Sequence, residues 1–117
     1  MATVIDGRAL AKKLNQQTSQ RVQKMQEDFG MTPGLVVVIV GDDPASQRYV
    51  RNKHRTAQRL GINSIVEHLD KDVSQSELLK LIDQFNNDPT IHGILVQEAL
   101  PDHINEKAIT RAILPEK

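Results

Sequence analysis

The sequence contains no cysteine and no tryptophan, and its aromatic residues are one tyrosine and two phenylalanines. Without cysteine the chain can form neither a disulfide framework nor a thiolate zinc site, which fits a reducing cytoplasm. Fifteen basic and fifteen acidic residues cancel, so no net charge attracts nucleic acid or an anionic membrane. The chain also lacks the ~20-residue apolar run of a membrane helix and the pattern of a secretory signal. We therefore expect a cytoplasmic protein with no nucleic-acid or membrane partner.

The length of 117 residues suits one compact domain with its own core, so residues 1–117 are treated as a single domain. Apolar residues recur at three- and four-residue spacing ahead of Gly30, a pattern that predicts a helix with one apolar stripe. The stripe consists of Leu10, Leu14, Thr18, Val22, Met25 and Phe29. The domain is thus predicted to begin with one long helix that ends near Gly30.

Three apolar segments predict strands, and helical segments separate them. Residues 35–40 form a β-branched run without polar alternation, as expected for a central strand that is covered on both faces. Two further strands are predicted over residues 62–69 and 91–97. The other predicted helices run from Pro44 to Leu60 behind an Asp cap, from the Ser74–Glu77 capping box to Phe85, and from Asn105 to Ile113. This alternation predicts a three-layer α/β domain, with a small parallel sheet of about three strands flanked by about four helices.

Ligands of open parallel sheets bind outside the carboxyl ends of the strands, which here means residues 41–46 and 97–101. The helix from Pro44 places one set of residues on a common face, namely Ser46, Tyr49, Val50, Lys53, Ala57 and Leu60. Lys53 lies near the middle of this face. Burial there would strip water from its ammonium and lower its pKa, as proton transfer near neutral pH requires. The alternative is a lysine whose stem covers apolar surface while the ammonium stays in water.

The opposite face of the same helix carries four arginines, Arg48, Arg51, Arg55 and Arg59. A basic helix face of this kind is usually solvated. Nucleic-acid binding through these arginines and His54 is an alternative, but the chain offers few aromatic residues for base stacking. We therefore expect this face to be the solvent side of the helix.

Tyr49 precedes Lys53 by one helical turn, so the two side chains can flank one ligand, with the ring as an apolar wall and the amine as a donor. A tyrosine at the edge of the core is the alternative. Gln97 is polar at the end of an apolar strand and can hydrogen-bond either the lysine or the ligand. Its alternative interpretation is simple termination of the strand.

No metal or nucleotide site is apparent in the pattern of histidines and glycines. The histidines, His54, His68, His92 and His103, have no ligand-like spacing, so we expect no bound metal. No two glycines are separated by a single residue, which excludes the Gly-x-Gly-x-x-Gly phosphate loop. We therefore expect residues 1–117 to bind no NAD(P) by that route.

Ordered motifs along nearly the whole chain carry a family resemblance. Residues 40–46, 46–53 and 92–97 closely resemble first-domain signatures of the bifunctional methylenetetrahydrofolate dehydrogenase/cyclohydrolase enzymes. Three shorter motifs match in order and spacing: Asp6-Gly7, Thr32-Pro33-Gly34 and Asp88-Pro89. The resemblance implies oxidation of 5,10-methylenetetrahydrofolate to 5,10-methenyltetrahydrofolate and hydrolysis of that product to 10-formyltetrahydrofolate. Residues 1–117 would then form the folate-binding catalytic domain.

The resemblance also implies roles for individual residues. The lysine that matches Lys53 is the general acid/base of the cyclohydrolase step, the matching Gln97 tunes it, and Tyr49 lies against the folate. Catalytic roles are therefore expected for Lys53, Gln97 and Tyr49. The implied substrate-binding set is Ser46, Tyr49, Lys53, Val96, Gln97, Glu98 and Pro101.

Two features depart from the family pattern. Glu98-Ala99 stands where the family usually has Leu-Pro, and the sequence ends at Lys117, before the family's pterin-binding aspartate. The family's NADP or NAD is bound by a C-terminal domain that is absent here, so we expect these residues alone to be inactive as a dehydrogenase. Full-length members are commonly homodimers. The alternative function is a non-catalytic folate-binding or interaction module with a degenerate loop.

Overall fold

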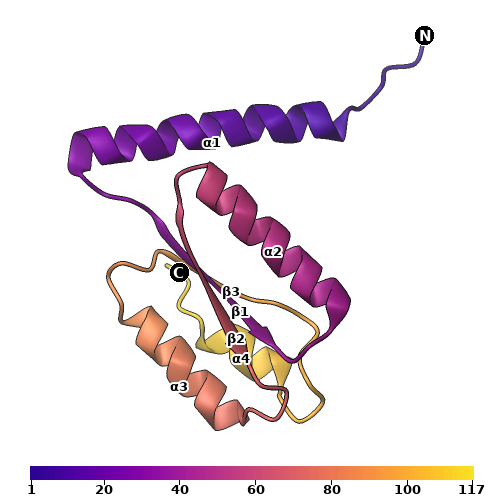
Figure 1. Cartoon of the computed structure of the whole chain (residues 1–117), viewed down its shortest axis with the longest axis vertical. Coiled ribbons are helices and arrows are strands. Elements are labelled where there is room, and N and C mark those ends of the chain that lie inside the picture. The colour runs from indigo at the N-terminus through magenta and orange to yellow at the C-terminus, as the bar shows by residue number, and fades with distance from the viewer.

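The computed structural model describes residues 1–117 as four helices and one three-stranded parallel sheet (Figure 1). The elements in chain order are α1 (Gly7–Phe29), β1 (Gly34–Val40), α2 (Pro44–Arg59), β2 (Asn63–Leu69), α3 (Gln75–Asn86), β3 (Gly93–Val96) and α4 (Glu106–Ala112). The strand order is β2-β1-β3, and β1 pairs in parallel with both neighbours. The predicted α/β fold class is confirmed, with the β-branched run of β1 at the centre.

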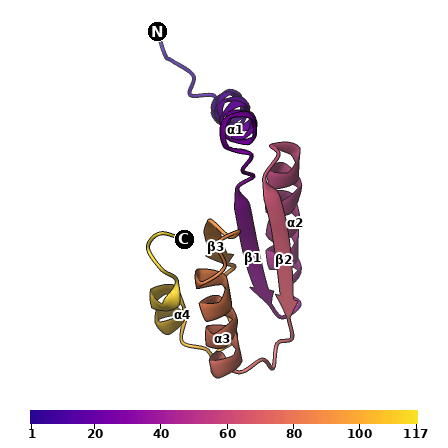
Figure 2. The same ribbon diagram turned by 90° about the vertical axis from the view of Figure 1, so that its left-hand side faces the viewer.

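Helices cover both faces of the sheet (Figure 2). Helix α2 lies on one face, whereas α3 and α4 lie on the other. Because successive side chains of a strand point to opposite faces, β1 contributes to two separate clusters. The larger, on the side of α3 and α4, consists of Val36, Val38, Val40, Leu78, Ile82, Ile91, Ile94, Leu100, Ile104 and Ile109. The smaller, on the side of α2, consists of Val37, Ile39 and Val50.

Every helix begins after a residue whose side chain accepts a hydrogen bond from the backbone N–H three positions later. These N-cap residues are Asp6, Asp43, Ser74 and Asn105. Such a bond satisfies one of the backbone donors that the first turn of a helix leaves free. Helix α1 ends at Gly30, which adopts a left-handed φ of 61° that favours glycine. The helix starts predicted at Asp43, Ser74 and Asn105 are confirmed.

Helix α1 lies across one end of the domain, outside the three layers (Figures 1 and 2). Val22 is its only buried residue, while Leu10 and Leu14 keep 55% and 51% of their surface exposed. The predicted helix is confirmed, but half of the residues of its apolar stripe are exposed. The sheet and α2 reach only the middle of the helix, so its ends extend beyond the domain. No helix of the structure is both long and apolar enough to cross a membrane.

Candidate functional site

The two segments predicted to receive a ligand lie side by side. β1 leads into the turn at residues 41–43, where Gly41 has a left-handed φ of 88° that favours glycine, and β3 leads into residues 97–101. Because β1 and β3 are parallel neighbours, both segments leave the sheet at the same edge. The backbone N–H of Gln97 donates to the carbonyl of Val38 at 2.8 Å, so pairing continues beyond β3. The first turn of α2 therefore lies next to the loop after β3.

A buried serine lies between these two segments. The carboxylate of Asp43 accepts hydrogen bonds from the backbone N–H and the hydroxyl of Ser46, each at 2.9 Å. These two donors hold the pKa of Asp43 below its usual range, with the backbone bond as the larger cause. Ser46 is only 7% exposed, and its hydroxyl oxygen also lies 3.3 Å from the carbonyl oxygen of Glu98. The hydroxyl has only one proton to donate. It therefore donates to the carboxylate of Asp43, which is nearer and charged, rather than to the carbonyl of Glu98.

Lys53 and Gln97 meet above the edge of the sheet. The ammonium Nζ of Lys53 donates to the side-chain oxygen of Gln97 at 2.5 Å. The amide nitrogen of Gln97 donates to the carbonyl oxygen of Glu98 at 3.0 Å. An amide that donates on one side must present its oxygen on the other, so this second bond fixes the orientation of Gln97 toward Lys53. The predicted contact between the lysine and the glutamine is confirmed. The alternative interpretation, that Gln97 terminates the strand, also holds, because β3 ends at Val96.

Of the two alternatives left open for Lys53, the structure shows the one in which the stem lies along apolar surface and the ammonium stays in water. Lys53 lies between the buried residues Val50 and Ala57 on the packed face of α2, yet its side chain is exposed. Its long stem carries the ammonium beyond the sheet to Gln97, where nothing else in the chain covers it. Tyr49, one turn earlier, is 58% exposed and is therefore not a core residue. Both side chains are free to face a ligand.

The remaining predicted residues lie around this pair without hydrogen bonds to Lys53. Val96 is half-buried and packs against the larger core cluster, and the carbonyl of Pro101 accepts from the backbone N–H of Ile104 at 3.0 Å. Glu98 is exposed and lines a hollow of about 230 Å³ that it shares with residues of α4. These α4 residues are Glu106, Lys107, Thr110 and Arg111. The backbone carbonyl of Glu98 therefore accepts the hydrogen bond from Gln97, while the residue also lines a separate hollow beside α4.

The sequence analysis missed the role of His68. The ring nitrogen Nε2 of His68, near the end of β2, lies 2.7 Å from the carbonyl oxygen of Gly41 and 3.4 Å from a carboxylate oxygen of Asp42. A nitrogen at hydrogen-bond distance from a carbonyl must carry the proton, so His68 donates to the turn that precedes α2. The same rule that selected the ends of β1 and β3 would have selected this residue at the end of β2.

The other three histidines form hydrogen bonds with groups of the same chain. His54 pairs with Ser64, His103 with the carbonyl of Val73, and the ring of His92 accepts from the backbone N–H of Gly34. His92 thus connects the start of β1 to the segment before β3. The structure contains no group of three or more His, Asp or Glu side chains that could hold a metal ion. Each of these three histidines therefore takes part in a hydrogen bond within the chain.

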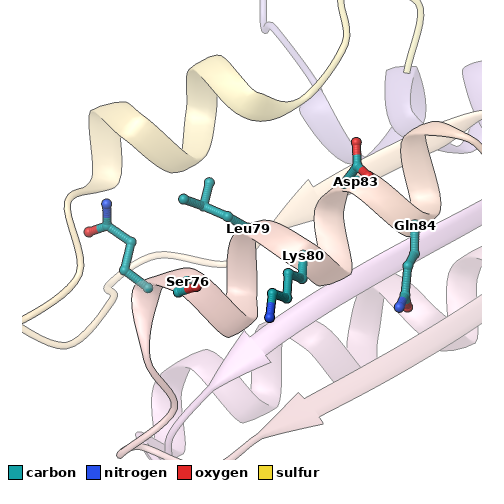
Figure 3. A pocket seen from close by; sticks show the side chains of 6 residues that line it. Ser76, Leu79, Lys80, Asp83 and Gln84 are labelled. Atoms are coloured by element: carbon teal, nitrogen blue, oxygen red, sulfur yellow. The ribbon is translucent and has the colours of Figure 1, made fainter.

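One hollow of the chain, of about 630 Å³, lies along α3 (Figure 3). Its lining residues are Gln75, Ser76, Leu79, Lys80, Asp83 and Gln84. All of them come from a single helix, and Lys80 and Asp83 bring opposite charges. An open surface on one helix cannot enclose a ligand, so we place the candidate site at the ends of β1 and β3 instead.

Comparison with known proteins identifies the family of this chain. The sequence model of the tetrahydrofolate dehydrogenase/cyclohydrolase catalytic domain matches residues 5–117. Bifunctional protein FolD 1 of Lactobacillus johnsonii is 52% identical over all 117 residues, which correspond to 41% of that protein. The chain thus spans about two-fifths of the length of the curated relatives it matches.

Solved structures give the same result. The FolD methylenetetrahydrofolate dehydrogenase/cyclohydrolase of Campylobacter jejuni superposes with a TM-score of 0.95 at 42% identity, covering 98% of this chain and 40% of that one. The Trypanosoma brucei enzyme, solved in complex with an NADP cofactor and an inhibitor, gives a TM-score of 0.93 at 36% identity, covering 99% of this chain and 39% of its own. The chain therefore belongs to the tetrahydrofolate dehydrogenase/cyclohydrolase catalytic-domain family.

Proposed function

We propose that the chain supplies the folate-side catalytic residues of an enzyme of one-carbon folate metabolism. This enzyme oxidises 5,10-methylenetetrahydrofolate to 5,10-methenyltetrahydrofolate and hydrolyses that product to 10-formyltetrahydrofolate. The observation that carries the proposal is the hydrogen-bonded pair of Lys53 and Gln97 beside the exposed Tyr49 at the carboxyl edge of the sheet. Membership of the family and the bifunctional FolD relatives support the same activity.

The hydrolytic step fits the groups of this site. Water adds to the positively charged methenyl carbon, a carbon–nitrogen bond of the bridge breaks, and one proton is released to solvent. The amine of Lys53 can take the proton of the attacking water and return it to the departing ring nitrogen. Gln97 is held by the carbonyl of Glu98 with its oxygen toward Lys53, so it accepts from the amine and fixes its position. Tyr49 provides a flat wall for the pterin ring one turn away.

The start of α2 does not fit the phosphates of a nicotinamide cofactor. In dinucleotide-binding folds the phosphates occupy the start of the helix after the first strand. Here the carboxylate of Asp43 occupies that position by accepting from the backbone N–H of Ser46, and Asp42 brings a second negative charge. The residues present do not fit the cofactor, so we derive no hydride step from them. We infer that NADP or NAD is bound by a separate domain of a longer, homodimeric cytoplasmic enzyme.

A non-catalytic binding role has no observation in its favour, because the pairing of Lys53 with Gln97 is formed despite the altered residues Glu98 and Ala99. Calorimetric titration of residues 1–117 with a folate analogue tests binding, which we expect to be weak because the site is open on one side. A spectrophotometric assay of methenyltetrahydrofolate hydrolysis tests the chemistry. Replacement of the general acid/base, Lys53→Met, should remove the enzymatic rate, since such catalysis contributes ~10²–10⁴-fold.

The matched control is Lys24→Met on the exposed part of α1, which should leave the rate unchanged. A Lys53→Met protein that hydrolyses methenyltetrahydrofolate within a few-fold of the unaltered chain contradicts the role of Lys53. If the unaltered chain shows no rate above the spontaneous one, the same pair of variants is compared in a longer protein that contains these residues. In that longer protein too, hydrolysis by the Lys53→Met variant within a few-fold of the unaltered rate would contradict the role of Lys53.

A further inference from the structure

A second hollow, of about 590 Å³, lies between α1 and the end of α2, and it is lined by basic and neutral polar side chains. The lining residues are Arg8, Ala11, Lys12, Asn15, Gln16, Ser19, Arg59 and Leu60. We call this hollow the α1–α2 groove. Both views show α1 crossing near the carboxyl end of α2, remote from the helix start beside the candidate site (Figures 1 and 2). The groove is therefore distinct from the site of Lys53 and Gln97.

The charges of the groove are all of one sign. Arg8 and Lys12 come from α1 and Arg59 comes from the last turn of α2, while no Asp or Glu lines the hollow. The only ion pair in the structure joins His68 to Asp42, so none of the three cations is neutralised by a carboxylate. Unpaired charges of like sign around one hollow repel one another and attract an anion.

Arg59 is not needed by the helix that carries it. Positive side chains in the last turn often bind the free carbonyls at the end of a helix. Here the backbone N–H groups of the following turn already occupy those carbonyls: Leu60 donates to Thr56 and Ala57, Gly61 to Gln58, and Ile62 to Ala57. The guanidinium therefore remains available to a ligand.

The spacing of the cations indicates more than one anionic group on the ligand. Arg8 and Lys12 are four residues apart on α1, which separates their positions by about 6 Å along the helix axis. Arg59 approaches from the other side of the groove. Asn15, Gln16 and Ser19 continue along the same face with neutral hydrogen-bond donors. A volume of about 590 Å³ is within the range of small-molecule sites.

We propose that the α1–α2 groove binds a small polyanion that carries two or more phosphate or carboxylate groups. Guanidinium groups bind both kinds of oxyanion with paired hydrogen bonds, which is why the two share one recognition chemistry. The groups of the ligand contact Arg8 and Lys12 on α1 and Arg59 on α2, so the ligand connects the two helices. Since the groove is open to water, the affinity should fall as salt screens these charges.

The test is a calorimetric titration of residues 1–117 with sodium tripolyphosphate at low salt, repeated with citrate to distinguish phosphate from carboxylate. Arg8→Gln and Arg59→Gln should each weaken binding by up to about five-fold, as expected for one lost charge pair near the surface. The matched control is Arg48→Gln, which removes the same charge from the exposed start of α2 outside the groove. Because Arg48 does not contact the ligand, this substitution should change the affinity less than two-fold.

Backbone amide spectra locate the ligand and show that each variant is folded. Binding should shift the amide resonances of Ala11, Asn15 and Leu60, on both sides of the groove. Absence of binding by both anions, or an equal loss of affinity in the Arg48→Gln protein, would overturn the proposal. Perturbations confined to residues near Lys53 would also overturn it, since they would assign the anion to the folate site.

Discussion

Ile82→Ala on α3 should strongly destabilise the domain, and the magnitude of this loss follows from the position of the side chain. Ile82 is 0% exposed and lies within the ten-residue cluster between the sheet and the α3–α4 layer. Truncating an isoleucine in such a core removes its transfer free energy and leaves a cavity, which together cost about 2–5 kcal/mol. The whole free energy of unfolding of a domain is only about 5–15 kcal/mol. The substitution should therefore remove a large fraction of the stability.

Urea unfolding followed by circular dichroism measures this loss as a shift of the midpoint at an unchanged slope. The matched control is Leu10→Ala, which truncates an aliphatic side chain of α1 that is 55% exposed. It should change the free energy of unfolding by no more than about 0.5 kcal/mol. A loss at Leu10 comparable with the loss at Ile82 would refute the assignment of α1 to the outside of the core. A loss below about 1 kcal/mol at Ile82 would refute the placement of the core itself.

Three further predictions concern the site. The pKa of Asp43 is lowered in the folded chain, so the stability from its ionised form is present above the unfolded value of 3.8 and is lost as the pH falls below it. Unfolding at stepwise lower pH should therefore show a smaller loss for Asp43→Asn than for the unaltered chain. Gln97→Leu removes the acceptor of Lys53 and should slow methenyltetrahydrofolate hydrolysis without changing the unfolding midpoint; an unchanged rate would contradict its positioning role. The double change Glu98→Leu with Ala99→Pro restores the family loop and should tighten folate binding in calorimetry, and weaker binding would show that this loop is compensated elsewhere.

The local elements could be predicted because each has its cause within a few residues. The β-branched run of β1 predicted a central strand, and the Asp, Ser and Asn caps predicted the starts of three helices. β3 is shorter than the predicted 91–97, since the backbone N–H of Ile91 bonds to the carbonyl of Asp88 in a turn before the strand. Strand ends depend on such turn bonds, which apolar runs do not reveal.

The contact between Lys53 and Gln97 could be anticipated from the sequence, whereas the exposure of Lys53 was one of two alternatives. The rule on strand ends and the helical spacing correctly brought Lys53 next to Gln97. The sequence left both a buried and an exposed ammonium open for Lys53, because helical periodicity reports which face packs, not how far a long side chain reaches beyond the packed surface. The exposure of Leu10 and Leu14 has a similar cause, since a periodic stripe does not specify how much of its length meets a neighbour.

The weak attachment of α1 has a consequence for motion. A helix of 23 residues with one buried side chain should separate from the domain at a lower free-energy cost than the strands and α3, whose buried residues form the core. In hydrogen–deuterium exchange, the amides of α1 should therefore lose their protons long before those of β1. A ligand that connects α1 to Arg59 would stabilise the docked helix and slow this exchange. The first helix would then report on occupancy of the groove through its rate of opening.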